Sequence, residues 1–235
     1  VQRRMRPALA TALVVLFLSV DLAFFTANIT KIEHGGWFPI TIAGAMFALM
    51  TTWKRGREAL GRYLSASTLA LDVFLDDLHA HPLHRIPGTG VFMTSNADGV
   101  PPVLLHHVKH NRVLHEHVVL LVVTTLNVPE VPASERAAVT TLREGFFKMK
   151  VHYGFMESPN IPEVLRAYGR GSFPVEPLEV TYYLGRETLL VTGPSKLAGW
   201  RKRLFAILAR NAQSATAFFN LPPNRVVELG AQVQL

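Results

Sequence analysis

The chain has 235 residues, 49% of them hydrophobic, and a mean hydropathy of +0.22, which is high for a protein without membrane contact. Its formal net charge of +7 favours anionic partners, such as nucleic acid or a membrane surface. It contains no cysteine, which excludes disulfide frameworks and thiolate chemistry. This length predicts one or two domains.

Two apolar segments open the sequence and predict two transmembrane helices. Residues 7–29 carry one charge, Asp21, and as a helix would reach about 35 Å, enough to cross a hydrocarbon core of about 30 Å. Residues 37–53 carry no charge, reach about 26 Å and are bracketed by Trp37 and Trp53, as interfacial anchors are. Apolar runs of this length disfavour the alternative, two buried helices of a soluble protein.

Basic residues predict the orientation of these segments. Three precede the first segment and three follow the second: Arg3, Arg4, Arg6, Lys54, Arg55 and Arg57. The positive-inside rule puts both ends in the cytoplasm and the connecting turn, "TKIEHGG", outside. We therefore expect a multi-pass protein of the cell inner membrane. Because the first residue is Val1 rather than Met, we also expect the sequence to lack its true N-terminus.

After the apolar segments, helical and strand patterns alternate. Leucines at helical spacing predict an amphipathic helix over residues 63–78. The β-branched run at 115–125 is typical of a buried central strand, and residues 179–192 predict a hairpin that turns near Gly185 and Arg186. Further strands are expected at 89–95, 139–155 and 225–235, and further helices at 101–111, 161–169 and from Pro194 onward.

This order of elements predicts three regions. Residues 1–57 would hold the two transmembrane helices, residues 58–64 would be a linker, and residues 65–235 would form a cytosolic α/β domain with a mixed sheet.

Several motifs occur in one order along the chain, among them "DLAFFTANITKIEHGGWFPI", "GVPPVLLHHVKHN", "VHYGFMESPNIP", "YYLGRETL" and "FFNLPPNRVVELG". Together they resemble the C-terminal third of bacterial potassium uptake transporters of the KUP/HAK/KT family, and the likeness covers essentially the whole chain. The resemblance implies an inverted-repeat secondary transporter with its ion site near the membrane midplane. It also implies low-specificity K⁺ uptake by K⁺:H⁺ symport.

On this resemblance, the chain would supply the last two transmembrane helices and the cytosolic domain. It would not transport alone, because two helices cannot enclose an aqueous pathway with satisfied backbone groups. The expected partners are membrane lipids, the missing N-terminal transmembrane helices of the same transporter and, as one option, a second copy in a homodimer. We expect no cofactor besides the transported ions, K⁺ and H⁺, and no nucleic acid.

Asp21 is the candidate residue for ion or proton handling. A carboxylate inside an apolar helix costs several kcal/mol unless it is paired, hydrated or protonated. It either faces the bundle interior as a cation or proton site, as the resemblance also implies, or bonds a neighbouring helix as a packing group. Thr26 and Asn28 lie near the helix end and are expected to be interfacial or capping groups.

Five histidines raise the alternative of a metal enzyme: His106, His107, His110, His115 and His117. His106 and His110 have the i, i+4 spacing of helical zinc sites, but no glutamate follows His106, so the metalloprotease pattern is absent. His115 and His117 are expected on one face of their strand. His106, His110 and His115 belong to the pattern of the family that this chain resembles, and that family does not consist of metal enzymes. We therefore expect neither a metal site nor enzyme activity.

A membrane-anchored regulatory domain that binds a small ligand, such as a nucleotide, is the alternative function. The glycine-containing turns at 87–90 and 169–171 match neither the dinucleotide fingerprint nor the Walker A loop. The basic cluster "WRKRLF" at 200–205 fits either contact with anionic lipid headgroups or a solvated helix face. No nucleic-acid-binding motif accompanies the basic charge, which we assign to the membrane flanks.

Overall fold

The structure, a computed structural model, describes residues 7–29, 31–66, 69–96, 99–143, 145–176, 178–190, 192–193 and 197–234. The three N-terminal arginines used for the orientation lie outside these residues. The chain divides into two units, Val1–Lys54 and Arg55–Leu235, and the division falls within one long helix.

The first unit contains α1 (Pro7–Ile29), a short π-helical turn (Ile32–Gly36) and the beginning of α2 (Trp37–Ala66). α1 is apolar on all sides, and its hydroxyl groups bond back to the helix, as when Thr26 Oγ1 donates to the Leu22 carbonyl at 2.8 Å. The turn requires glycine at Gly35, where φ is +109°. Such a helix suits a lipid environment, because its backbone groups and these hydroxyl groups are satisfied internally.

Within the described residues, one helix is long and apolar enough to cross a membrane. It is Ala8–Ile29, and none of this segment is buried inside the structure. The second predicted span, 37–53, is helical as part of α2 but does not meet the same criterion of length and hydropathy, so it stays a prediction. Residues 58–64 continue α2 as helix.

The second unit is an α/β domain with a six-stranded mixed sheet. Its strands are β1 (His84–Thr94), β2 (Val113–Leu126), β3 (Ala137–Thr141), β4 (Phe146–Gly154), β5 (Val180–Leu190) and β6 (Val226–Gln234). Its helices are α3 (Leu71–Ala80), α4 (Pro102–Asn111), α5 (Ile161–Tyr168), α6 (Gly199–Arg210) and α7 (Ala215–Phe218), with 3₁₀ turns at Ala133–Glu135 and Pro223–Arg225.

The strand order is β3-β4-β2-β1-β5-β6, and only the β3–β4 pair is antiparallel. From the central strand β1 the chain passes through α4 to β2 on one side, and it later returns through α5 to β5 on the other side. This reversal makes the carboxyl end of β1 a topological switch point, the usual place for a ligand crevice in open α/β sheets.

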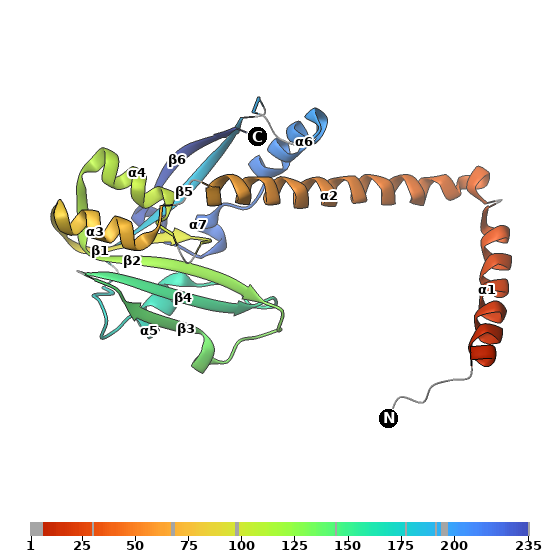
Figure 1. Cartoon of the computed structure of the whole chain (residues 1–235), viewed down its shortest axis with the longest axis horizontal. Helices are drawn as coiled ribbons and strands as arrows, with labels where there is room; N and C mark the ends of the chain where they lie inside the picture. The colour runs from red at the N-terminus through yellow and green to blue at the C-terminus, as the bar shows by residue number, and fades with distance from the viewer. Residues whose placement is uncertain are drawn as a thin grey trace. The chain divides into compact units, whose positions relative to one another are not determined.

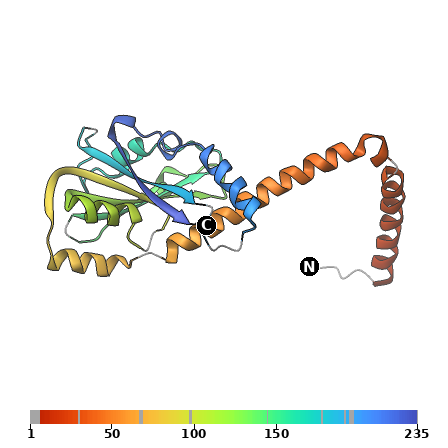
Figure 2. The ribbon, with the colours of Figure 1, turned by 90° about the horizontal axis from the view of Figure 1, so that it is seen from above.

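Apolar side chains alternate along the strands and build one core on each face of the sheet. Phe92, Val118 and Leu120 pack under α3 and α4, whereas Val91, Val119 and Leu121 pack under α5. Figures 1 and 2 show these helices on opposite sides of the sheet. Because β2 is covered on both faces, a continuous apolar run is the pattern it needs.

Two predicted elements were wrong. The single helix expected at 63–78 is divided between the end of α2 at Ala66 and α3, which begins at Leu71. The hairpin expected around Gly185 is instead one strand, β5, which runs parallel to β6 from Tyr182 to Leu190. Gly185 does not have the positive φ that a tight hairpin turn would use, so nothing turns the chain there.

Candidate functional site

Asp21 lies near the middle of α1, and its side chain is exposed in this chain. The other polar residues singled out nearby have local roles. The Thr26 hydroxyl bonds its own helix, and Oδ1 of Asn28 accepts a hydrogen bond from Lys31 Nζ at 3.0 Å, beside the end of α1. Among Asp21, Thr26 and Asn28, Asp21 is therefore the one charged residue, and its side chain is exposed on a mostly apolar helix.

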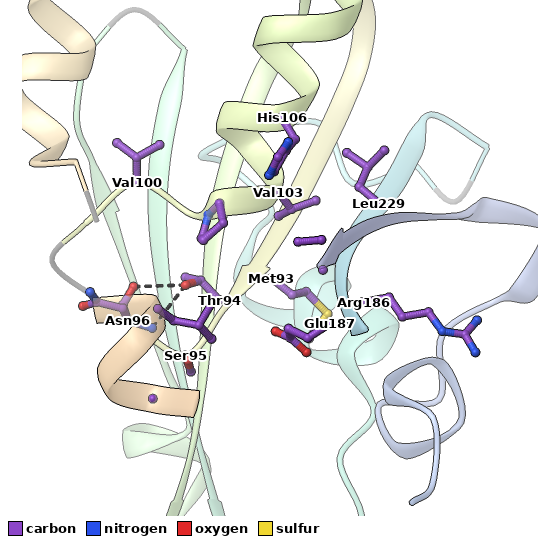
Figure 3. A pocket seen from close by; sticks show the side chains of 15 residues that line it. Met93, Thr94, Ser95, Asn96, Val100, Val103, His106, Arg186, Glu187 and Leu229 are labelled. Atoms are coloured by element: carbon purple, nitrogen blue, oxygen red, sulfur yellow. Dashed lines mark hydrogen bonds between the residues drawn. The ribbon is translucent and has the colours of Figure 1, made fainter. Parts of the chain in front are cut away.

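A cavity of about 380 Å³ lies at the topological switch point, where the carboxyl end of β1 meets β5 and the start of α4. Polar and apolar side chains both contribute to it (Figure 3). The lining residues are Gly61, Leu64, Met93, Thr94, Ser95, Asn96, Val100, Pro102, Val103, His106, Gly185, Arg186, Glu187, Leu229 and Ala231. A cavity of this size falls within the range of small-molecule sites.

Two charged side chains of β5 behave differently at this cavity. The Glu187 carboxylate lies beside Met93, whereas the Arg186 guanidinium is directed away from the other lining residues (Figure 3). Arg186 Nη1 pairs with Glu228 Oε2 on β6 at 3.2 Å. The polar side chains that line the cavity are therefore the Glu187 carboxylate together with Thr94, Ser95, Asn96 and His106, and the one carboxylate disfavours an anionic ligand.

The start of α4 is not built to hold a phosphate. In dinucleotide-binding folds the free N–H groups of the first helical turn point at the anion. Here Pro101 and Pro102 have no N–H, and the N–H of Leu104 already donates to the Pro101 carbonyl at 2.9 Å. This geometry agrees with the absence of a glycine fingerprint in the loop between β1 and α4.

His107 and His115 are buried side by side between α4 and the sheet. Their ring centres are 6.4 Å apart, and those of His107 and Tyr183 are 4.7 Å apart, beside the stacked pair Phe92 and Tyr183. Nε2 of His107 and Nδ1 of His115 are buried without a hydrogen-bond partner among the described residues. Burial lowers the pKa of both histidines, and repulsion from His107 lowers that of His115 further.

The other histidines are dispersed. His106 and His110 stack on α4 with ring centres 6.1 Å apart, and His106 also lines the cavity. His117 lies against Phe147 in the core under α5, on the opposite face from His115, so the prediction that His115 and His117 share a face was wrong. The strand register shifts beside them, between Ile86 and Thr89 of β1. In the described part of the chain, no three His, Asp or Glu side chains form a metal-binding group.

The two buried histidines are expected to make the domain less stable at acid pH. Because burial lowers their pKa in the folded state, protons bind the unfolded chain more tightly. The contribution of these two neutral histidines to the free energy of unfolding is therefore fully present above about pH 6.5 and is lost progressively as the pH falls below this value. We expect His107→Gln to flatten this slope, measured as the urea midpoint against pH. The exposed His110→Gln is the control, and an unchanged slope in His107→Gln would contradict the prediction.

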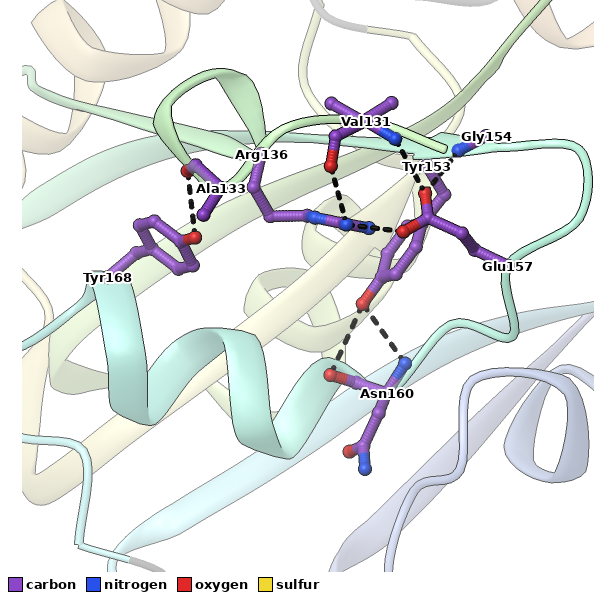
Figure 4. Close-up of polar contacts among 8 residues, drawn as sticks. All are labelled: Val131, Ala133, Arg136, Tyr153, Gly154, Glu157, Asn160 and Tyr168. Carbon is purple, nitrogen blue, oxygen red and sulfur yellow. Dashed lines mark hydrogen bonds and ion pairs between the residues drawn. The ribbon is translucent and has the colours of Figure 1, made fainter. Parts of the chain in front are cut away.

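Glu157 organises the loops that follow β2 and β4 (Figure 4). Its carboxylate pairs with the Arg136 guanidinium and accepts the N–H groups of Gly154 at 2.6 Å and Val131 at 3.1 Å. Arg136 in turn lies over the Tyr153 ring, 4.8 Å from its centre. The hydrogen bond from Arg136, followed by that from Gly154, lowers the pKa of Glu157 to about 2. We assign this network a structural role.

Protonation of Glu157 is expected to cause a second loss of stability, at lower pH. Its folded pKa is depressed, so its contribution is fully present above about pH 4.5 and is lost as the pH falls toward 2. We expect Glu157→Gln to lower the urea midpoint of unfolding at neutral pH. Between about pH 4.5 and pH 2 this midpoint should then fall less in Glu157→Gln than in the unchanged chain. The exposed Glu163→Gln is the matched control. Equal acid profiles for Glu157→Gln and the unchanged chain would refute the role of this carboxylate.

Comparisons with known proteins agree with the sequence motifs. Residues 87–235 match the model of the "K+ potassium transporter C-terminal domain", and residues 1–58 match that of the "K+ potassium transporter integral membrane domain". The chain is 55% identical over 231 residues to the "Probable potassium transport system protein Kup" of Anaeromyxobacter sp. (strain Fw109-5), covering 96% of this chain and 35% of that protein. It is 53% identical over 226 residues to the protein of the same name from Myxococcus xanthus (strain DK1622), covering 96% of this chain and 35% of that protein.

The chain spans about a third of the length of these curated relatives. No solved structure matches it. The two family models match in the order membrane domain, then C-terminal domain, over most of the chain. This chain therefore belongs to the K⁺ potassium transporter family and corresponds to the C-terminal part of its relatives.

Proposed function

We propose that this chain is the C-terminal part of a transporter that imports K⁺ by symport with H⁺. The observation that carries the proposal is the match to both domain models of the family in consecutive order. The exposed apolar surface of α1 supports it, because such a helix needs lipid or further helices around it. Asp21 on α1 would take part in ion or proton handling.

The direct test is uptake by the full-length protein that contains this chain. It is expressed in cells without their own K⁺ uptake systems, and K⁺ entry is measured at several external pH values, with and without a protonophore. We expect entry above the empty-vector level that falls when the protonophore removes the proton gradient. Entry that ignores the proton gradient would refute symport, and no entry from protein present in the membrane would refute K⁺ import.

In the proposed topology the chain lies in the inner membrane. The turn after α1 is outside, and the α/β domain is on the cytoplasmic side. This topology rests on the basic residues that flank the apolar segments. Because the chain has no cysteine, a single introduced cysteine is an unambiguous reporter. An impermeant thiol reagent added to intact cells is expected to label Glu33→Cys and not Met156→Cys. The reverse pattern would overturn the topology.

A second candidate function, regulation by a small ligand, is favoured by the cavity at the switch point. The α/β domain would then be a regulatory rather than a catalytic part of the transporter. Because α4 offers no phosphate cradle and Glu187 lines the cavity, we expect a nucleoside to bind better than its 5′-phosphate. Equilibrium dialysis of the chain with adenosine and AMP tests this. Binding of neither probe, or equal binding to a chain with Val103→Trp in the cavity, would exclude this ligand at this site.

A further inference from the structure

The exposed face of α6 has a composition unlike a solvated helix surface. Trp200, Arg203, Ile207 and Arg210 follow one another at intervals of three or four residues and therefore share one face of the helix. We call these four residues the α6 stripe. Trp200 and Ile207 are each 55% exposed, and α6 contains no acidic residue. Large apolar side chains alternating with arginine are typical of helices that lie in a membrane interface.

The opposite face of α6 is fixed to the domain. Lys202 is buried and donates from Nζ to the Gly193 carbonyl at 2.6 Å, while Phe205 is buried in a small core with Leu60 and Val233. The Arg201 guanidinium lies over the Trp200 ring, 5.0 Å from its centre, which supports the exposed tryptophan from the side. The stripe is therefore presented by a helix whose inner face is held.

α6 packs on the part of α2 that follows the predicted second span in the sequence. The Phe205 ring lies directly over Gly56, where a Cβ atom would overlap it. α2 is one continuous helix, so Gly56 follows Trp53, the last residue of the predicted second span, by about 4.5 Å along the axis. Arg55, Arg57 and Arg62 are exposed on the same stretch of α2 and make it positively charged.

We propose that the α6 stripe binds the anionic surface of the bilayer that holds α1, with Trp200 and Ile207 at headgroup level and Arg203 and Arg210 on lipid phosphates. The proposal rests on the proposed membrane topology. It makes the α/β domain a second membrane attachment rather than a domain tethered only by α2. Near an anionic surface, each arginine is expected to change the docking equilibrium about fivefold, and the pair about 25-fold.

Spin labels at single cysteines in the full chain test this proposal. The chain is reconstituted in nanodiscs of phosphatidylcholine alone, or of phosphatidylcholine and phosphatidylglycerol in equal parts. Accessibility to oxygen, which partitions into lipid, is compared with accessibility to a water-soluble nickel complex. We expect Ile207→Cys to gain oxygen accessibility several-fold in the anionic discs and to lose this gain when Arg203→Gln and Arg210→Gln are added. Met156→Cys, at a position 74% exposed after β4, is the control and should stay water-accessible.

Other outcomes overturn the proposal and are distinguishable from a failure of the topology. Equal accessibility at position 207 in both lipid mixtures, or water accessibility like that of position 156, would refute docking on anionic lipid. Spin–spin broadening at position 207 would instead identify a second copy of the chain as the occupant. A label at Phe17→Cys on α1 reports the span itself. If position 17 is lipid-exposed and position 207 is not, only the α6 proposal fails.

Discussion

Replacement of Asp21 by asparagine in the full-length transporter is expected to abolish K⁺ uptake or to weaken it severely. Asparagine keeps the size and hydrogen-bonding capacity of the side chain but removes the charge and the titratable proton. Ionised, Asp21 would attract a cation along the pathway, and protonated it would carry the coupled proton. Both roles need a carboxyl group, so Asp21→Glu should retain part of the uptake.

The surroundings of Asp21 explain why a large effect is expected. Its neighbours along α1 are apolar and exposed, so in the assembled protein they must meet lipid or other helices. A carboxylate in such a segment costs several kcal/mol unless a cation, a proton or a polar partner compensates for it. The cost of placing a carboxylate here favours a role in ion handling over packing.

Thr26→Val provides a control on the same helix, because the Thr26 hydroxyl already bonds the Leu22 carbonyl and needs no external partner. We expect this isosteric variant to transport normally. Uptake is measured at matched amounts of protein in the membrane, at two or more values of external pH. If Asp21→Asn transports as the unchanged protein does, with the same pH dependence, Asp21 is a packing residue and the site assignment is wrong.

Local patterns predicted those elements whose burial is decided close by in the sequence. The β-branched apolar run at 115–125 is typical of a buried central strand, and it forms β2, Val113–Leu126. Residues 101–111 begin with two prolines and form α4, in which Pro102 occupies the first turn. In both cases the side chains that fix the structure lie within the element itself.

The failures arose where distant residues decide. Gly185 reads as a turn in isolation, yet β5 continues through it because β6, about 40 residues later, pairs with it from Tyr182 to Leu190. Leucines keep helical spacing from Leu64 to Leu78, so the interruption between α2 and α3 leaves no mark in the apolar period. Propensity and periodicity contain no information on which strand a segment will meet.

The candidate sites show the same division. Asp21 was identifiable from the sequence because one charge in an apolar run is visible without a fold. The cavity at the switch point combines the end of β1 with the middle of β5 and β6 and with residues of α4 and α2, and the Glu157–Arg136 pair joins residues on separate loops. No spacing rule connects these residues, so they could be recognised only after the topology was known.

Gly154→Ala is expected to cause a large loss of domain stability. Gly154 is the last residue of β4, and a Cβ there would overlap the carbonyl oxygen of Pro129 in the loop after β2. That loop cannot easily retreat, because its carbonyls accept the N–H groups of Phe155 at 2.9 Å and Met156 at 3.2 Å. The N–H of Gly154 itself donates to Glu157 at 2.6 Å, so a shift of this residue would also strain the carboxylate network.

Overpacking against fixed backbone costs about 1–3 kcal/mol, which exceeds the gain of about 0.4–1 kcal/mol from the reduced freedom of the unfolded chain. Each kcal/mol lowers the melting temperature of a domain of this size by roughly 2–4 °C. Gly185→Ala is the matched control, because a Cβ on this strand glycine meets no atom within 4 Å. Thermal unfolding of the two variants, followed by circular dichroism, should separate them clearly. A melting temperature for Gly154→Ala at or above that of Gly185→Ala would show that the loop after β2 yields freely and that the Pro129 contact does not constrain this position.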